Sequence, residues 1–302
     1  MNIKNRDVII IGAGKIAHSL VPALQKSGYN VAEVISRKLV SAKKLAVKYG
    51  VKHFSDNPKD IRLKSGIVFL CVPDAEIRNA AKQLLGLKLN FGRFIFIHMS
   101  GALDISCLNQ LKKKNGLTAS FHIMQTFPSK KPVAITGCYA AIETDKKPIE
   151  KVLFDIAGNL ALKPFALKSS AKTFYHIAGV FASNFLVGNM YNAESAFKKT
   201  GNKNINFYEL ISPILFSTLS NINKTGAANA LSGPVERGDI ETIKEHLEVL
   251  KKDAIKRNDN SLLLNYIAQS LNLLEVAKKK HGKAQESLKK TRIFLHNSLK
   301  NY

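Results

Sequence analysis

The chain has 302 residues, of which 45% are hydrophobic and 23% charged, which is typical of a globular protein with room for two domains. Its net charge is +24, but the lysines are scattered and do not alternate with aromatic residues along one element, so nucleic acid is not a predicted partner. No apolar run is long enough to cross a membrane, so a membrane is not predicted either. The three cysteines suit neither a disulfide framework nor a metal site, and we expect a cytoplasmic protein without a bound metal.

The first predicted element is a buried parallel strand at residues 8–11, which ends in a glycine-rich turn. The turn and the residues after it follow the GxGxxA form of the dinucleotide-binding fingerprint. The glycines permit a tight turn and a close approach of a pyrophosphate, and the helix from about residue 15 to 27 points its free N–H groups at the phosphates. The cofactor contacts predicted here are Gly12, Gly14, Lys15, Ile16 and Ala17.

The end of the second predicted strand, residues 31–35, indicates which dinucleotide is bound. An NAD site carries Asp or Glu at this position to bind the ribose 2′-hydroxyl, whereas this chain has Ser36, Arg37 and Lys38. A hydroxyl and a guanidinium bind a 2′-phosphate through charge-assisted hydrogen bonds. The sequence therefore predicts NADP(H) as the cofactor.

Further strands are expected at residues 51–54, 67–72, 94–98, 118–123, 139–143 and 161–167, with helices at about 41–49, 75–85 and 147–158. This order predicts an α/β Rossmann fold with a doubly wound, mostly parallel sheet. Ligands of such sheets bind beyond the carboxyl ends of the strands. Asp74 is expected to cap the helix that follows it. The predicted ligand contacts at this edge are Val72, Pro73, Ser100 and Gly101 for the cofactor and His122 for the substrate.

From Ser169 onward the pattern is helical, and we place the domain boundary there: residues 1–168 for the NADP-binding domain and 169–302 for an all-α substrate and dimerisation domain. A long helix from about residue 171 to 199 is mostly apolar between Phe174 and Met190, which predicts burial on nearly all sides. Further helices are expected at about 206–224, 239–257, 261–279 and 283–299. The long helix is a candidate subunit interface.

Polar side chains on the long helix are candidates for catalysis, because reduction of a carbonyl or imine needs a proton donor beside the nicotinamide. Lys172 and His176 are four residues apart and share a face, and Ser183 falls close to that face at 100° per residue. Lys172 or His176 would donate the proton, Asn184 would orient the substrate, and Ser183 would bind it. The alternative is a structural helix end with an exposed lysine and a packing histidine.

A second candidate segment is the loop at residues 231–239, LSGPVERGD. Its Gly-Pro pair predicts a rigid turn, and Asp239 is suited to cap the next helix. Arg237 would bind a substrate carboxylate in a bidentate manner. A purely structural loop is the alternative interpretation.

Five segments together resemble a known bacterial family: residues 12–17 (GAGKIA), 98–101 (HMSG), 122–127 (HIMQTF), 176–184 and 232–239 (SGPVERGD). Members of that family join a Rossmann-like NADP oxidoreductase domain to a helical C-terminal domain of unassigned function. Their layout is similar to that of pyrroline-5-carboxylate reductase, ketopantoate reductase and the 3-hydroxyisobutyrate and 6-phosphogluconate dehydrogenases. The resemblance covers essentially the whole chain and implies an NADP-linked reductase, often dimeric through the helical domain.

These observations lead to three functional hypotheses. The first is an NADPH-dependent oxidoreductase that reduces a small anionic ketone, with ketopantoate (2-dehydropantoate) as the leading substrate. The second is an imine reductase similar to pyrroline-5-carboxylate reductase. The third is an NADP-binding sensor or scaffold without turnover. For all three we expect a homodimer formed by the C-terminal helices.

Overall fold

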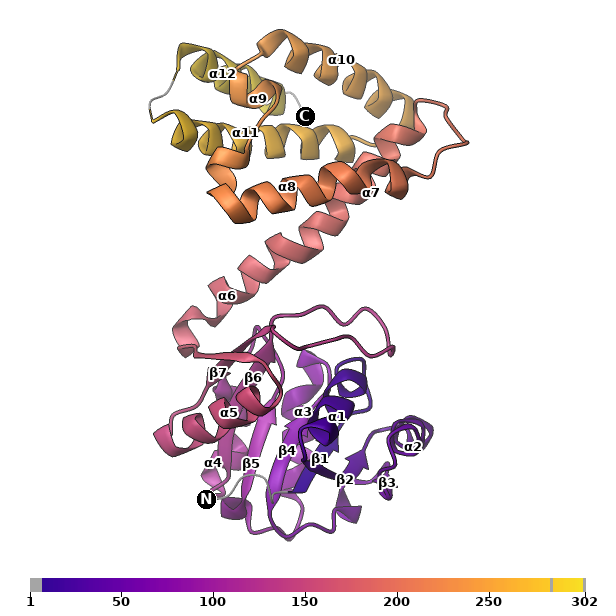
Figure 1. Cartoon of the computed structure of the whole chain (residues 1–302), viewed down its shortest axis with the longest axis vertical. Coiled ribbons are helices and arrows are strands. Elements are labelled where there is room, and N and C mark those ends of the chain that lie inside the picture. The colour runs from indigo at the N-terminus through magenta and orange to yellow at the C-terminus, as the bar shows by residue number, and fades with distance from the viewer. Residues whose placement is uncertain (1–6, 283–284, 301–302) are drawn as a thin grey trace. The chain divides into compact units, whose positions relative to one another are not determined.

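The structure is a computed structural model that describes residues 7–282 and 285–300. The chain forms two compact units, Met1–Leu186 and Val187–Tyr302, each with its own core. The first unit therefore includes the beginning of the long helix as well as the whole sheet (Figure 1). No helix among the described residues is both long and apolar enough to cross a membrane.

The first unit contains an eight-stranded sheet in the order β3-β2-β1-β4-β5-β6-β7-β8, and all neighbouring strands are parallel except β6 and β7. The mostly parallel Rossmann fold is thus confirmed. The antiparallel pair marks the point at which a long loop at residues 124–138 reverses the chain direction. The strands are β1 Asp7–Ile11, β2 Asn30–Ile35, β3 His53–Ser55, β4 Gly66–Leu70, β5 Phe94–His98, β6 Leu117–Ile123, β7 Tyr139–Glu143 and β8 Lys163–Ala166.

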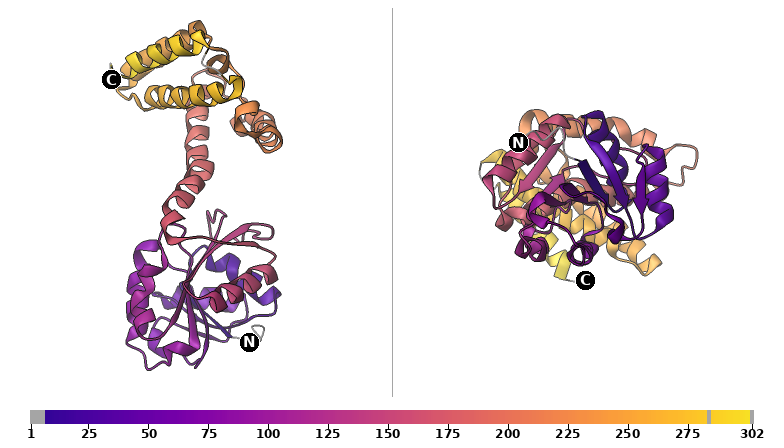
Figure 2. Two further views of the ribbon diagram at one scale, coloured as in Figure 1. Left: turned by 90° about the vertical axis from the view of Figure 1, so that its left-hand side faces the viewer. Right: turned by 90° about the horizontal axis from the view of Figure 1, so that it is seen from below.

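Helices cover both faces of this sheet (Figure 2). Side chains alternate along a strand, so Val8 and Ile10 of β1 join a core with α1, α2 and α5, while Ile9 and Ile11 join a second core with α3 and α4. The near-continuous apolar runs of the strands follow from this double burial. The helices are α1 Ala17–Lys26, α2 Leu39–Lys48, α3 Asp74–Leu85, α4 Asn109–Lys113 and α5 Lys147–Asn159, with short 3₁₀ turns at 58–60, 91–93, 105–108 and 169–171.

The long helix consists of α6 Lys172–Gly179, a π-helical turn at Val180–Asn184 and α7 Phe185–Lys198. Its extent agrees with the prediction, but the predicted burial on nearly all sides is wrong: Phe174 is 78% exposed and Val187 69%. Apolar composition shows that a helix favours burial, but it does not say which surface covers it. The π turn also rotates the residues after it relative to those before it. The shared face that a uniform α-helical pitch predicts for Lys172, His176 and Ser183 therefore does not apply.

The helical unit packs its core between α9, α10, α11 and α12, around Val235, Leu247 and Ile267. Helix α8 contains a break at Gly226, whose φ is +79°, and exposes apolar side chains such as Ile214 and Phe216. Residues 283 and 284, where the last helix was predicted to begin, lie outside the described residues. The helices are α8 Phe207–Ala230, α9 Pro234–Arg237, α10 Ile240–Arg257, α11 Ser261–His281 and α12 Glu286–Lys300.

Candidate functional site

The glycine turn after β1 draws three strand ends together. Gly12 has φ +101°, and a Cβ at this position would lie 2.5 Å from the carbonyl oxygen of Cys71, so only glycine fits. The Gly12 N–H donates to the Ile35 carbonyl at 2.7 Å, and the Cys71 N–H donates to the Ile11 carbonyl at 2.7 Å. These contacts bring the ends of β1, β2 and β4 around one turn, as a dinucleotide site requires.

Helix α1 begins directly after this turn. Ile16 is its N-cap residue and has no polar side chain to satisfy the first-turn amides, which leaves them available to an anion. Ala17 is completely buried, so the helix packs closely against the sheet. Both observations agree with the phosphate-binding role predicted for residues 12–17.

A cleft of about 330 Å³ opens at this edge of the sheet. Its walls include several residues predicted from the sequence to bind the cofactor, namely Gly12, Gly14, Ser36, Arg37, Val72 and Pro73. Its walls do not include the other five predicted cofactor contacts, Lys15, Ile16, Ala17, Ser100 and Gly101. The cleft thus runs from the phosphate-binding turn to the end of β2, where the adenosine half of a dinucleotide lies in this fold.

The end of β2 provides the groups expected to recognise a 2′-phosphate. The Ser36 hydroxyl accepts a hydrogen bond from the Ala13 N–H at 3.4 Å. The Arg37 side chain is 81% exposed and approaches only Glu76, at 3.6 Å, among the contacts of the described residues. An exposed ion pair of this length is weak, so the guanidinium is free to turn toward a phosphate.

Lys130 also lines the cleft, and the sequence analysis missed it. It lies in the 124–138 loop, which is fixed on α1 by a hydrogen bond from the Val133 N–H to the Ser19 hydroxyl, 3.0 Å long. The side chain of Gln125 closes the base of the loop by donating to the Ala134 carbonyl at 3.2 Å. In the sequence, Lys130 could not be told from the other lysines of a solvated surface.

Ser100 and Asp74 form a hydrogen bond in place of the predicted cap of α3 by Asp74. Asp74 was expected to cap α3, but Pro73 occupies the N-cap position and the Asp74 carboxylate instead accepts a hydrogen bond from the Ser100 hydroxyl at 2.7 Å. The same hydroxyl accepts from the backbone N–H groups of Ala102 and Leu103, at 3.2 and 3.0 Å. Ser100 therefore fixes the turn after β5 and links it to the start of α3.

Lys172 is only 2% exposed, and its ammonium group is fully engaged. It donates to the Ser100 carbonyl at 3.2 Å and to the Ser120 hydroxyl at 2.5 Å, and it forms an ion pair with Glu143 at 3.3 Å. Burial lowers the pKa of Lys172, and the carboxylate of Glu143 opposes that shift. The contacts fasten the first turn of α6 to the ends of β5 and β7 and to the middle of β6.

Glu143 completes this buried cluster and is a residue that the sequence analysis missed. One of its oxygens accepts hydrogen bonds from the Ile105 N–H at 3.1 Å and from the Ser169 hydroxyl at 2.5 Å. Its position as a carboxylate at the end of an apolar strand was the available signal. A buried carboxylate needs such partners, which indicates a structural role for the pair with Lys172.

His98 is completely buried below the cluster. Its Nδ1 accepts a hydrogen bond from the Ser100 N–H at 3.3 Å. Desolvation, followed by the nearby charge of Lys172, lowers the pKa of His98 to about 3. The imidazole therefore stays neutral and serves the packing of the β5 end.

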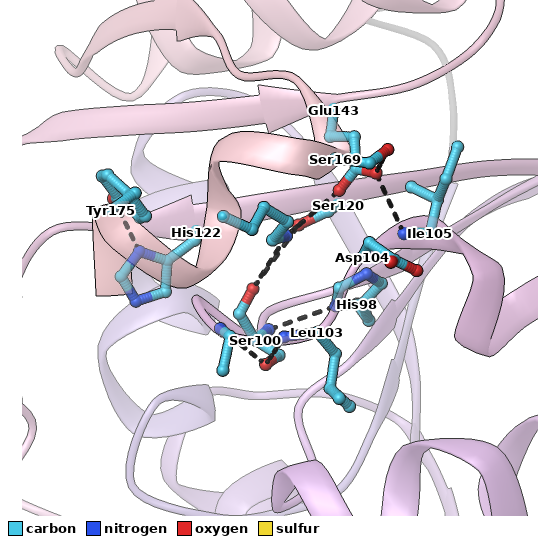
Figure 3. Close-up of polar contacts among 12 residues, drawn as sticks. His98, Ser100, Leu103, Asp104, Ile105, Ser120, His122, Glu143, Ser169 and Tyr175 are labelled. Atoms are coloured by element: carbon cyan, nitrogen blue, oxygen red, sulfur yellow. Dashed lines mark hydrogen bonds and ion pairs between the residues drawn. The ribbon is translucent and has the colours of Figure 1, made fainter. Parts of the chain in front are cut away.

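His122 and Tyr175 meet at the carboxyl edge of the sheet (Figure 3), and the imidazole lies against Gly101. The Nδ1 atom of His122 lies 2.7 Å from the Tyr175 hydroxyl, and the two rings are perpendicular with centroids 5.4 Å apart. A Cβ at residue 101 would lie 2.7 Å from Nε2 of His122, so glycine makes room for the imidazole. Desolvation, then the charges of Lys172 and His176, lower the pKa of His122 to about 4.

The other predicted residues of the long helix are more open. His176 is exposed and close enough to His122 to affect its pKa. Asn184 is exposed and Ser183 partly exposed, and both lie in the π turn. Within the described residues, no hydrogen bond joins Ser183 or Asn184 to His122 or His176.

In the helical unit, the 231–239 segment is largely structural. Glu236 pairs with Lys280 at 3.1 Å and with His281 at 2.9 Å, and the Asp239 side chain caps α10 by accepting from the Thr242 N–H, as predicted. Gly238 lies so close to Ser287 that a Cβ would be 2.6 Å from its hydroxyl oxygen. Arg237 is exposed among these engaged neighbours.

Comparisons with known proteins match two separate stretches of the chain. Residues 7–95 match the family model described as NADP oxidoreductase, coenzyme F420-dependent, and residues 138–270 match a domain of unknown function, DUF2520. By its nucleotide domain the chain is an NADP-dependent oxidoreductase. This agrees with the family resemblance inferred from the sequence motifs, including the helical part of unassigned function. A comparison with curated proteins finds no match.

Solved structures support the fold of this NADP-dependent oxidoreductase. A protein of Bacteroides fragilis, provisionally described as an NADP oxidoreductase, has 22% identity and a TM-score of 0.71 over 93% of this chain and 100% of its own. Pyrroline-5-carboxylate reductase of Coxiella burnetii has 15% identity and a TM-score of 0.53 over 89% and 98%. A reductive aminase of Aspergillus terreus, solved with NADPH, has 12% identity and a TM-score of 0.55 over 98% and 94%.

Proposed function

We propose that this oxidoreductase uses NADPH to reduce a small anionic ketone or imine, with 2-dehydropantoate as the leading substrate. The observation that supports this best is the neutral imidazole of His122 beside Gly101, at the sheet edge where the nicotinamide end of a dinucleotide lies in this fold. The nearby charge of Lys172 opposes protonation of the ring, and the Asp74 carboxylate, which acts in the opposite sense, is hydrogen-bonded to Ser100, so the neutral ring can offer an N–H to a developing negative charge. This is the environment that reduction of a carbonyl needs.

Bound NADPH supplies the hydride, and the residues of the chain must hold the substrate and manage the proton. We assign the hydrogen bond to the substrate oxygen or nitrogen to Nε2 of His122. A neutral imidazole is an effective donor of this kind, as it is in triosephosphate isomerase. His176, exposed and close to His122, is the second candidate donor.

Lys172 was our other candidate for proton transfer, and its contacts support a different role. Its ammonium group already binds a carbonyl, a hydroxyl and a carboxylate within a buried cluster. Moving it to a substrate would leave Glu143 buried and unpaired, which is costly. We therefore propose that Lys172 holds α6 in place under the reacting groups.

For the anionic part of the substrate we propose Arg237, with Ser183 and Asn184 as polar contacts. Arg237 is exposed, while its neighbours Glu236 and Asp239 are committed to ion pairs and to a helix cap. The segment thus holds the backbone of Arg237 firmly and leaves its guanidinium available. A guanidinium binds a carboxylate in a bidentate manner.

A homodimer is part of this proposal. Many exposed apolar side chains lie on the long helix, among them Phe181, Phe185 and Val187, and on α8, among them Ile214 and Phe216. Exposed apolar patches of this extent mark interaction surfaces in globular proteins. We expect a second copy of the chain to cover them.

Two alternatives are tested in the same experiment. The names of the structural relatives, a pyrroline-5-carboxylate reductase and a reductive aminase, favour imine substrates as the alternative to ketones. The purified chain would be mixed with NADPH and a panel of 2-oxo acids and cyclic imines, and the loss of NADPH absorbance measured. Turnover of 2-dehydropantoate supports the leading hypothesis, and turnover of cyclic imines alone supports the alternative. Tight NADPH binding without turnover of any member would contradict both and indicate a sensor or scaffold.

A further inference from the structure

We infer that Tyr175 is a positioning residue for His122: its hydroxyl donates to Nδ1 and so fixes the imidazole in the form that carries its proton on Nε2, toward the substrate. This inference rests on the proposed reduction, because it names the group that prepares the donor. Tyr175 was not among the residues predicted from the sequence. It lies in the first turns of α6, 53 residues from His122, and reaches it only in the folded chain.

Three contacts hold the Tyr175 ring in its orientation. Its hydroxyl oxygen is 2.7 Å from Nδ1 of His122, and the ring meets His122 edge to face. On its other side the ring packs edge to face on Phe165 of β8, with centroids 5.9 Å apart. The backbone next to it is anchored through the buried Lys172. The hydroxyl therefore has little freedom to turn away.

The direction of the hydrogen bond follows from the acidities of the two groups. A phenol is a stronger hydrogen-bond donor than a neutral imidazole, and imidazole nitrogen is the stronger acceptor. Burial raises the pKa of Tyr175 to about 12, so the phenol keeps its proton. His122 is neutral, with one nitrogen able to accept. With Nδ1 accepting, the only N–H of the ring is on Nε2.

Nε2 is also the nitrogen that faces the turn after β5. The space above Gly101 is occupied by the far edge of the imidazole, including Nε2. Ser100 and Gly101 end the central strand β5, where ligands bind in this fold. A donor at Nε2 therefore lies on the side of the ring at the end of β5, whereas Nδ1 faces Tyr175 of α6.

The proton balance of the step is simple. When the hydride reaches the carbonyl carbon, the electron pair of the C=O bond moves to oxygen, and the Nε2–H of His122 donates a hydrogen bond to the negative charge that develops there. The alkoxide then takes a proton from a water molecule, and the solvent neutralises the hydroxide that remains. His122 and Tyr175 keep their protons throughout, so the resting tautomer is retained, and only NADPH is oxidised.

A second pair in the chain provides a matched control. His246 and Tyr266 in the helical unit have the same geometry, with 2.8 Å between Nδ1 and the hydroxyl and perpendicular rings 5.7 Å apart. This pair is on α10 and α11, its histidine is exposed, and no glycine turn of the sheet adjoins it. The same histidine–tyrosine geometry thus occurs at a place where we propose no site. The position of His122 at the sheet edge distinguishes its pair with Tyr175 from the pair of His246 and Tyr266.

The direct test is ¹⁵N NMR of the histidine side chains in the full chain, with His122 assigned from the spectrum of His122→Gln. We expect the wild-type signal of His122 to show the proton on Nε2, and the Tyr175→Phe variant to show a mixture of both tautomers. Tyr266→Phe should change His246 and leave His122 as it was. A wild-type His122 with its proton on Nδ1, or a Tyr175→Phe signal identical to wild type, would overturn the inference.

Kinetics of the same variants separate positioning from folding. Tyr175→Phe keeps the ring against Phe165, so NADPH affinity should stay at its wild-type value while kcat falls by about 10- to 100-fold with little change in KM. Tyr266→Phe should retain full kcat. An unchanged kcat in Tyr175→Phe would refute the role in catalysis. Absence of turnover in the wild type would instead refute the proposed reduction, and the NMR result would still decide the tautomer.

Discussion

Replacement of Lys172 by methionine tests the structural role assigned to it. Methionine is similar in length but has no charge, so Glu143 would remain buried with hydrogen bonds from Ile105 and Ser169 and without its cation. Breaking a buried ion pair in this way costs about 3–5 kcal/mol. At roughly 2–4 °C per kcal/mol for a unit of this size, the melting temperature of the first unit should fall by about 6–20 °C.

The assay is calorimetry of the full chain, with two controls. Lys147→Met removes an exposed ion pair with Glu150 and should cost at most about 1 kcal/mol. The double variant Lys172→Met with Glu143→Gln removes both charges and should recover much of the lost stability, because no unpaired charge stays buried. A Lys172→Met protein that melts like the wild type but has lost turnover would refute this reasoning and return Lys172 to the list of proton donors.

Three further predictions concern charge. Arg37→Asp should weaken NADPH binding at least about 10-fold and leave NADH binding near its wild-type value, as measured by titration. Lys130→Ala should weaken NADPH binding, whereas Lys131→Ala, which changes a neighbour outside the cleft, should not; equal affinities of both variants would remove Lys130 from the site. The pKa of His122 is about 4 in the folded chain and 6.5 without burial, so the unfolded chain binds more protons between these pH values and stability must fall as the pH drops from 6.5 to 4. His122→Gln should reduce this loss of unfolding free energy between pH 6.5 and 4 by up to roughly 3 kcal/mol. The same pH dependence in urea unfolding of the variant and the wild type would contradict the lowered pKa of His122.

The parts of the fold that depend on local pattern were predictable. The glycine turn at residues 12–14 and the strands on either side of it are encoded by short apolar runs and by a glycine spacing that has one common structural use. The cap at Asp239 follows the same logic, since it depends on residues within one turn.

Features that depend on residues far apart in the chain were not predictable. In the sequence, Asp74 is a plausible helix cap. In the folded chain, the pairing of β4 and β5 brings the Ser100 hydroxyl, 26 residues away, to the Asp74 carboxylate instead. The pairs of Lys172 with Glu143 and of Tyr175 with His122 likewise exist only once α6 lies on the sheet. The π turn at residues 180–184 has no local signal either, and it changed the face on which Ser183 and Asn184 were expected.

The most direct test of the proposed site is a crystal structure of the chain with NADPH bound. We expect the 2′-phosphate at Ser36 and Arg37, the diphosphate on the turn at Gly12–Gly14, and the nicotinamide C4 over the end of β5 with Nε2 of His122 facing the space beside it. A nicotinamide at any other edge of the sheet, or a His122 ring that points Nδ1 at that space, would contradict it.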